Sequence, residues 1–230
     1  MNISINVIIP AYNEQDSIAK VVAEIPTDIG VTDIIVCDNN STDNTAAVAK
    51  AAGAIVVSQP IAGYGNACLK GMAFVAKKDI TPDIIVFLDG DYSDYPDEMR
   101  YLIQPILNDG VDMVIGSREL GDRENGAMMP QQIFGNWLAT TLIKWLHKYE
   151  FSDLGPFRAI TWKKLMELNM EDKTYGWTCE MQVKAAKQGF KCTEVAVNYR
   201  KRIGVSKVSG TIKGTILAGY KIIWTIFKFL

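Results

Sequence analysis

Asp89 and Asp91 stand one residue apart directly after residues 84–88, the most apolar run of the chain. Two carboxylates at the end of a buried strand can share a hard divalent cation that is bound to a diphosphate. Mg²⁺ or Mn²⁺ held there would neutralise the charge that develops on a departing nucleoside diphosphate. The same D-x-D spacing is common in solvated acidic turns, so its position after a buried strand is what favours a metal site.

Three other predicted strand ends carry polar side chains: residues 11–14, residues 38–41, and the pair Ser117 and Arg118. Ligands of parallel α/β sheets bind outside the carboxyl ends of the strands, so four such clusters together indicate one binding site. Arg118 can hold a phosphate or a carboxylate through two parallel hydrogen bonds. An ion pair with an acidic neighbour in the sequence is the alternative role for this arginine.

The first half of the chain has the pattern of an α/β sheet that would position these clusters. Short β-branched runs alternate with helical patterns of about ten residues, which predicts βαβ units and a mostly parallel sheet covered by helices on both faces. The predicted strands are 7–9, 34–37, 55–57, 84–88 and 113–115, and the predicted helices are 16–24, 45–52, 66–77 and 96–107.

The second half is less regular. We expect a helix over 131–149, a loop over 151–158, a helix over 178–188 and an alternating strand over 195–199. From about residue 208 the pattern is again helical, with lysines in one sector beside apolar side chains, which is typical of a basic amphipathic helix. We expect one domain over 1–230, in which 1–120 bind the nucleotide, 121–207 face the acceptor and 208–230 form the C-terminal helix.

Composition excludes several classes of protein. The 230 residues are 48% hydrophobic and 22% charged, which excludes a disordered chain, a collagen-like fibre and a small disulfide scaffold. The net charge of −2 argues against a nucleic-acid partner. Charge is unevenly spread, because no acidic residue follows Glu194 and seven basic residues do. A basic tail on an acidic body suggests an anionic partner, either phosphate groups or a membrane surface.

The four cysteines lack the spacing of a zinc or redox motif, and we expect reduced thiols. The first residues lack the basic region of a signal peptide, and lysines interrupt the apolar C-terminal stretch too often for a bilayer span. We therefore expect a cytoplasmic protein, with peripheral contact to the inner face of the cell membrane through 208–230. The oligomeric state is left open.

Three motifs at strand ends carry a family resemblance. They are Pro10-Ala11-Tyr12-Asn13-Glu14, Asp38-Asn39-Asn40-Ser41-Thr42-Asp43 and Phe87-Leu88-Asp89-Gly90-Asp91. In these motifs the chain resembles family 2 glycosyltransferases with the α/β GT-A fold, and it is most similar to the dolichyl- and polyprenyl-phosphate hexose synthases. The resemblance runs from about Ile5 to Tyr220. It implies a Rossmann-like nucleotide-binding half joined to an acceptor-binding half.

The resemblance implies a set of donor-binding residues. Members of the family bind the nucleotide with the first loop and with the aspartate after the second strand. Here Tyr12 would stack on the base, and Asp38 would accept a hydrogen bond from uracil or from guanine, so the base is open. Tyr64 stands where many relatives have a lysine between two glycines, which leaves backbone N–H groups of that loop as phosphate donors. The full set is Pro10, Ala11, Tyr12, Glu14, Asp38, Asn40, Gly65, Asp89, Gly90 and Asp91, with Asp89 and Asp91 as metal ligands.

The acceptor side is implied by two further segments. Residues 153–158 look like the acceptor motif of the family, with Pro156 at a place where an acidic residue would serve as a base. Asp153 is then the candidate base and Glu180 the second choice, beside Asp91 and Arg118 as catalytic residues. Residues 200–207 resemble the basic loop that closes over phosphates. The expected acceptor or phosphate ligands are Arg118, Arg158, Arg200, Arg202, Ser206 and Lys207.

These expectations describe an inverting glycosyltransferase that uses Mg²⁺ or Mn²⁺. The donor would be a nucleotide-sugar, with UDP-glucose ahead of GDP-mannose, and the acceptor would be polyprenyl phosphate or a small phosphorylated or hydroxylated molecule. One alternative is a sugar nucleotidyltransferase, although residues 10–17 contain no glycine for its activating loop. The other is a catalytically silent nucleotide-sugar-binding module or membrane adaptor, against which Asp89, Asp91 and Arg118 argue.

Overall fold

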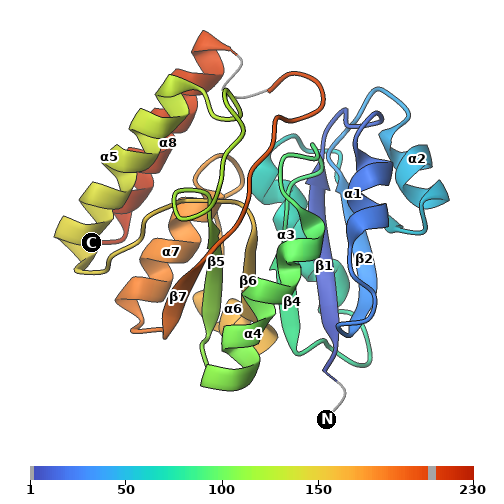
Figure 1. Ribbon diagram of the computed structural model, residues 1–230, viewed down its shortest axis with the longest axis horizontal. Helices are drawn as coiled ribbons and strands as arrows, with labels where there is room; N and C mark the ends of the chain where they lie inside the picture. The colour runs from blue at the N-terminus through green and yellow to red at the C-terminus, as the bar shows by residue number, and fades with distance from the viewer. Residues whose placement is uncertain (1–2, 207–210) are drawn as a thin grey trace.

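A seven-stranded sheet runs through the molecule in the computed structural model, which describes residues 3–206 and 211–230 (Figure 1). The strand order is β3-β2-β1-β4-β6-β5-β7. Strand β6 runs antiparallel to both of its neighbours, and the other neighbouring pairs are parallel. The strands are β1 Ile5–Ala11, β2 Val31–Asp38, β3 Ile55–Ser58, β4 Ile84–Phe87, β5 Met113–Ser117, β6 Arg158–Thr161 and β7 Cys192–Ala196.

Helices cover both faces of the sheet, as the sequence predicts. One face carries α1 Ile18–Glu24, α2 Thr45–Ala51, the short turn η1 Pro96–Glu98 and α4 Met99–Asp109. The other carries α3 Tyr64–Val75, α5 Pro130–His147, α6 Trp162–Leu168 and α7 Trp177–Lys187, with α8 Ile212–Lys228 packed on α5 and α7. Strand β1 shows why: Val7 and Ile9 pack against the first group and Ile8 against the second, because successive side chains of a strand point to opposite faces.

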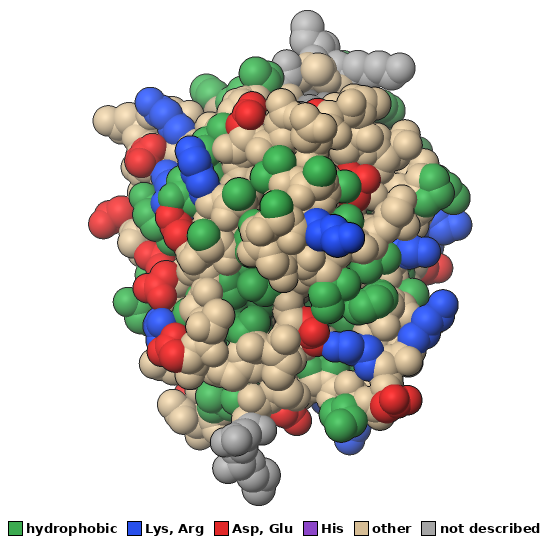
Figure 2. Space-filling model, turned by 90° about the vertical axis from the view of Figure 1, so that its right-hand side faces the viewer, with side chains coloured by type: hydrophobic (Ala, Val, Ile, Leu, Met, Phe, Trp, Pro, Cys, Tyr) green, Lys and Arg blue, Asp and Glu red, His purple; other side chains and the backbone are tan. Residues whose placement is uncertain are grey.

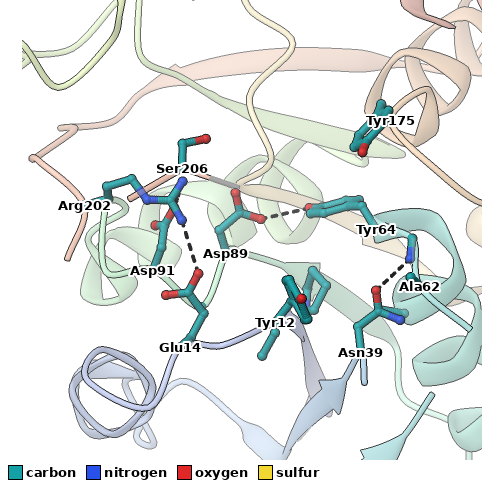
Figure 3. A pocket seen from close by; sticks show the side chains of 15 residues that line it. Tyr12, Glu14, Asn39, Ala62, Tyr64, Asp89, Asp91, Tyr175, Arg202 and Ser206 are labelled. Atoms are coloured by element: carbon teal, nitrogen blue, oxygen red, sulfur yellow. Dashed lines mark hydrogen bonds and ion pairs between the residues drawn. The ribbon is translucent and has the colours of Figure 1, made fainter. Parts of the chain in front are cut away.

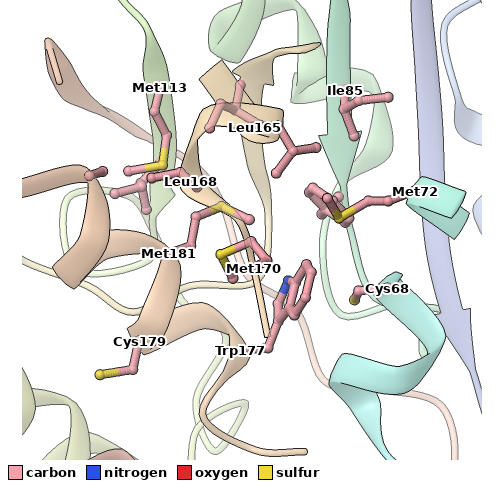
Figure 4. Close-up of a cluster of buried hydrophobic side chains, with 14 of the residues drawn as sticks. Cys68, Met72, Ile85, Met113, Leu165, Leu168, Met170, Trp177, Cys179 and Met181 are labelled. Carbon is pink, nitrogen blue, oxygen red and sulfur yellow. The ribbon is translucent and has the colours of Figure 1, made fainter. Parts of the chain in front are cut away.

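The core beneath α3 and α7 is rich in methionine (Figure 4). Trp177 packs edge-on against Phe87 of β4, with ring centroids 5.9 Å apart. Flexible methionine side chains fill the irregular space around this aromatic pair. All four residues of β4 are buried. The aspartates that follow β4 are therefore attached to a strand that packing holds on both sides.

Three elements of the second half differ from the sequence-based expectation. Residues 158–161 form β6 and residues 162–168 form α6, in a stretch between the expected loop and the expected helix at 178 to which we assigned no element. The last strand spans Cys192–Ala196 rather than the expected 195–199. It ends earlier than expected because the chain leaves the sheet edge after Ala196. Tyr199 instead forms isolated bridges with Asp94 and Arg123. The alternating pattern over 195–199 indicated a strand but placed it three residues too late.

The basic tail lies against its own body. In α8, the Lys221 Nζ is 2.9 Å from an oxygen of Asp172, and the Lys228 Nζ is 2.8 Å from an oxygen of Glu171. While these lysines pair with the body, several large apolar side chains of α8 are exposed to solvent. Within the described residues, no helix combines the length and the apolar character that crossing a bilayer needs. On the face seen in Figure 2, acidic and basic side chains are interspersed around a hydrophobic hollow.

Candidate active site

A cavity of about 270 Å³ opens where β1, β2 and β4 end (Figure 3). Its walls come from the loops after these strands, from the start of α3, and from two segments far along the chain. Seven residues predicted from the sequence line it: Pro10, Ala11, Tyr12, Glu14, Asp89, Gly90 and Asp91. Arg202 and Ser206 from the basic loop also line it, as do Asn39, Ala62, Gly63, Tyr64, Ala67 and Tyr175.

Asp89 and Asp91 lie on one side of this cavity. Tyr64 donates a hydrogen bond from its hydroxyl to Oδ1 of Asp89, over 3.0 Å. Asp91 accepts from the backbone N–H of Ser93 and lies 3.1 Å from the Arg202 guanidinium. Burial, followed by the nearby charge of Asp91, raises the pKa of Asp89 to about 7. The two carboxylates thus lie near enough that ionising both in this buried site is costly.

This arrangement fits a divalent cation. Among the residues that the structure describes, no group of three or more His, Cys, Asp or Glu side chains gathers around a common point. Two carboxylates suffice when a substrate diphosphate supplies the remaining oxygens, as is usual for Mg²⁺. Burial and the charge of Asp91 both disfavour ionised Asp89, and the charge of a divalent cation held there would favour it. Asp89 and Asp91 are therefore the residues that would hold the metal.

The opposite end of the cavity is aromatic. Tyr12 is 43% exposed and lies beside Asn39 and Ala62, as Figure 3 shows. Asn39 accepts from the Gly63 N–H and donates to the carbonyl of Ile61, so the loop before α3 is held against the end of β2. Predicted residue Asp38 does not line the cavity, but its Oδ1 is buried and has no hydrogen-bond partner among the described residues. Because this atom is buried and lies outside the cavity wall, the expected hydrogen bond from Asp38 to the base is not supported.

Two other predicted donor residues act through the backbone. Asn40 has a φ of 63° and does not line the cavity. Its role is therefore to adopt the left-handed backbone conformation that this turn requires. Gly65 donates its N–H to the carbonyl of Thr174. A Cβ at Gly65 would approach the Asp172 carbonyl more closely than real Cβ atoms ever do. Gly65 is therefore needed for the close contact between α3 and residues 172–174.

The basic loop divides into an anchor and a cavity residue. The Arg200 guanidinium lies 3.3 Å from the centre of the Tyr92 ring, pairs with Glu24 at 2.7 Å and donates to the Tyr92 carbonyl. Arg200 is thus a structural anchor that does not line the cavity, and the expectation that it binds phosphate is not supported. Arg202 reaches the cavity, where it pairs with Glu14 at 3.2 Å as well as with Asp91. Lys207 lies outside the described residues.

Arg118 and Asp153 form a closed pair. The Arg118 Nε and Nη2 donate to the two oxygens of Asp153, each over 2.7 Å, and the Arg118 N–H adds a third bond. Burial alone would raise the pKa of Asp153, but the guanidinium outweighs it and holds that pKa below its usual value. Both oxygens of Asp153 are engaged, so its expected role as a base is not supported. Arg118 takes the alternative role, an ion pair, although its partner is distant in sequence.

Arg158 and Glu180 are also structural, which corrects both predictions. Arg158 is fully buried, and its guanidinium donates to the carbonyls of Leu154, Gly155 and Thr178. It cannot reach a phosphate in the cavity. Glu180 is fully buried as well; it accepts from the backbone N–H groups of residues 171 and 172 and pairs with a lysine one turn later. These bonds position the loop that carries Tyr175, so Glu180 has no free oxygen for a base.

Comparison with known proteins identifies the family. The model of the family described as glycosyl transferase family 2 matches residues 6–167. An uncharacterized glycosyltransferase of Mycobacterium tuberculosis (strain ATCC 25618 / H37Rv) is 33% identical over 223 residues, which cover 94% of each chain. The chain belongs to glycosyl transferase family 2.

Other members of glycosyl transferase family 2 are similar over nearly the whole chain. A dolichyl-phosphate hexose transferase of Haloferax volcanii is 29% identical and covers 88% of this chain and 85% of its own. In structure, the glucosyl-3-phosphoglycerate synthase of Mycobacterium tuberculosis in complex with Mn²⁺ and UDP-glucose matches with a TM-score of 0.74 at 24% identity. That match covers 98% of this chain and 78% of the synthase, and it confirms the GT-A fold.

Sequence reasoning missed part of the cavity. Tyr175 comes from a loop without a recognisable motif, and its place depends on the bonds that Glu180 makes to residues 171 and 172 and on the contact of the sequence-distant Gly65 with Thr174. Asn39 could have been found, because it lies inside the polar cluster after the second strand. Tyr64 was noted only as a departure from the lysine of relatives, and nothing in the sequence indicates that it contacts Asp89.

Proposed function

We propose that this enzyme transfers a hexose from a nucleoside-diphosphate sugar, with UDP-glucose favoured over GDP-mannose. The observation that carries the proposal is the cavity that Asp89 and Asp91 line together with the exposed aromatic ring of Tyr12. A base on Tyr12 and a diphosphate beside the aspartates would span this cavity. The structural relative crystallised with Mn²⁺ and UDP-glucose supports both the metal and the donor.

The residues around the leaving group are suited to its charge. A divalent cation held by Asp89 and Asp91 would stabilise the negative charge that develops on the nucleoside diphosphate. Arg202 adds a guanidinium on the same side of the cavity. Displacement by the acceptor at the anomeric carbon in one step would invert its configuration. This chemistry requires strong stabilisation of the leaving group and places few demands on a base.

The acceptor that fits best is polyprenyl phosphate. Both expected bases, Asp153 and Glu180, have their oxygens engaged in internal bonds. A hydroxyl acceptor needs a base, whereas a phosphate acceptor is already an anion. A dolichyl-phosphate hexose transferase among the relatives supports a lipid phosphate.

An exposed apolar surface supports a lipid as well. We call it the α5–α8 face, because it lies on two helices that pack side by side (Figure 1). Its residues are Ile133, Phe134, Trp137, Trp145, Ile216, Leu217, Tyr220, Ile223, Trp224 and Phe227. Apolar surfaces of this extent mark contact sites for proteins or membranes. Ser206 lines the cavity and Thr211 precedes α8, so five chain steps, about 18 Å at most, separate the cavity from this helix.

We therefore place the α5–α8 face against the membrane, with the cavity near the lipid headgroups. Because Lys221 and Lys228 are paired internally, the apolar side chains would supply this contact rather than the basic ones. Flotation with lipid vesicles tests it. Replacing Trp137 and Trp145 together by Glu should abolish flotation, and Ile80→Glu, which changes an exposed apolar residue elsewhere, should not. Equal flotation of all three proteins would refute the membrane contact.

Transfer assays test the reaction itself. Radiolabelled UDP-glucose and GDP-mannose are each supplied with undecaprenyl phosphate in vesicles or with 3-phosphoglycerate in solution, with Mn²⁺ or with EDTA. We expect label in the lipid phase, from UDP-glucose, in the presence of Mn²⁺. Label on 3-phosphoglycerate alone would refute the lipid acceptor and retain the donor. In a separate reaction with UTP and glucose 1-phosphate, formation of UDP-glucose with release of pyrophosphate would favour a nucleotidyltransferase. Binding of donors without turnover in either reaction would favour an adaptor.

A further inference from the structure

Tyr64 holds one of the two aspartates of the proposed metal site. Its hydroxyl donates to Oδ1 of Asp89 over 3.0 Å. Within residues 3–206 and 211–230, this is the one side-chain hydrogen bond to that carboxylate. Asp91, by comparison, is held by Ser93 and Arg202. The orientation of Asp89 therefore depends on a single phenol.

The position of Tyr64 is fixed by the backbone on each side of it. The Gly63 N–H donates to Oδ1 of Asn39 over 2.8 Å, and the Gly65 N–H donates to the Thr174 carbonyl over 3.2 Å. Both glycines lie so close to the carbonyls of residues 172 and 173 that neither position has room for a Cβ. The first turn of α3 is thus locked between the end of β2 and residues 172–174. Tyr64 enters the cavity from a rigid support (Figure 3).

We propose that Tyr64 is a positioning residue for the metal site: it fixes Oδ1 of Asp89 so that the carboxylate is oriented for a divalent cation before the cation arrives. The inference rests on the proposed function, because it assumes that Asp89 and Asp91 hold a metal. Hydrogen bonds to ligating carboxylates orient them, and their loss typically weakens metal binding by about 10- to 100-fold. A neutral phenol does this without cancelling the charge of the carboxylate.

Tyr64→Phe tests the proposal, because it removes the hydroxyl and keeps the ring that packs in the cavity wall. Binding of Mn²⁺, alone and with saturating UDP, is measured by electron paramagnetic resonance of the free ion, with UDP and Mn²⁺ without protein as the blank. We expect Tyr64→Phe to weaken Mn²⁺ binding about tenfold, which corresponds to about 1.4 kcal/mol. Tyr175→Phe is the matched control: it removes a phenol hydroxyl from the same cavity, away from Asp89, and should leave the Mn²⁺ affinity within twofold.

A kinetic readout separates positioning from a general loss of structure. In Tyr64→Phe the KM for Mn²⁺ should rise about tenfold, while kcat at saturating Mn²⁺ stays within threefold and the melting temperature stays close to that of the wild type. If Tyr64→Phe is poorly folded, Tyr64→His, which retains a ring donor, should bind Mn²⁺ more tightly than Tyr64→Leu. Equal Mn²⁺ affinity of the wild type and Tyr64→Phe would overturn the inference alone. A wild type that binds no Mn²⁺ either alone or with UDP would overturn the metal in the proposed function and this inference with it.

Discussion

Replacing Asp89 by Asn should make the metal-free protein more stable at neutral pH. Burial and the charge of Asp91 raise the pKa of Asp89 to about 7 in the folded protein, against an ordinary value of 3.8. Between these two values the folded state binds more protons at this site than the unfolded state. The free energy of unfolding must therefore fall as the pH rises through this window.

The size of the effect follows from the same two values. One pKa unit corresponds to 1.36 kcal/mol, so ionised Asp89 costs on the order of 4 kcal/mol of stability above pH 7. The amide that Asp89→Asn introduces carries no charge and retains the acceptor oxygen for Tyr64. We expect the wild type and Asp89→Asn to be similarly stable near pH 4, and Asp89→Asn to be more stable near pH 8 by up to about 4 kcal/mol.

Urea denaturation followed by circular dichroism, with EDTA present, measures this difference from pH 4 to pH 8. The buried carboxyl of Asp94 also has a raised pKa, so the informative quantity is the difference between the two proteins at each pH. Adding Mn²⁺ at pH 8 to 100 times its Kd should then stabilise the wild type by about 2.7 kcal/mol and the variant by much less. If the free energies of unfolding of the two proteins vary with pH in the same way, ionisation of Asp89 does not destabilise the folded protein, and the reasoning is refuted.

Three further substitutions test residues for which the structure indicates a different role from the one expected from the sequence. Arg158→Leu leaves several buried carbonyls without donors and should lower the free energy of unfolding by about 3 kcal/mol in urea, with UDP binding of the folded protein retained; an unchanged stability would contradict its structural role. Gly65→Ala should weaken UDP binding at least tenfold by calorimetry, whereas Gly135→Ala, an open helix position, should leave UDP binding unchanged and stabilise the protein by about 0.5–1 kcal/mol. Arg118→Met strands the carboxylate of Asp153 and should cost about 3–5 kcal/mol at pH 7 and less near pH 4, where that carboxyl can take up a proton; a cost that does not vary with pH would contradict the pairing.

The part of the cavity that follows β1 and β4 was predictable from the sequence, because the ends of these strands can be recognised in it. Residues 7–11 and 84–88 are apolar and are followed at once by polar side chains. Parallel strands bring such ends to one edge of a sheet, so proximity follows from the fold class without knowledge of any contact. Tyr12, Glu14, Asp89 and Asp91 do line one cavity, as this reasoning predicts.

The arrangement of residues 121–207, which we expected to face the acceptor, was not predictable in the same way. Strand β6 begins with Arg158, contains four residues and is set by the gap between β4 and β5 rather than by its own pattern. For charged side chains, the residue type does not reveal whether the charge faces the cavity or the interior. Arg158, Glu180 and Arg200 could be assigned only when their partners were known, and Arg200 lies 176 residues from Glu24 in the sequence.

The uneven charge of the chain has an explanation inside the fold. A body with net charge −9 and a tail with +7 suggested an external anion, but Arg200, Lys221 and Lys228 pair with Glu24, Asp172 and Glu171 of the body. Ion pairs between basic residues of the tail and acidic residues of the body thus hold the tail against the body. Arg202 differs, because its partners Glu14 and Asp91 belong to the cavity. A bound cation would compete with Arg202 for Asp91, and the diphosphate would offer the guanidinium new acceptors. Donor binding should therefore exchange the partners of Arg202 while the anchor at Arg200 stays in place.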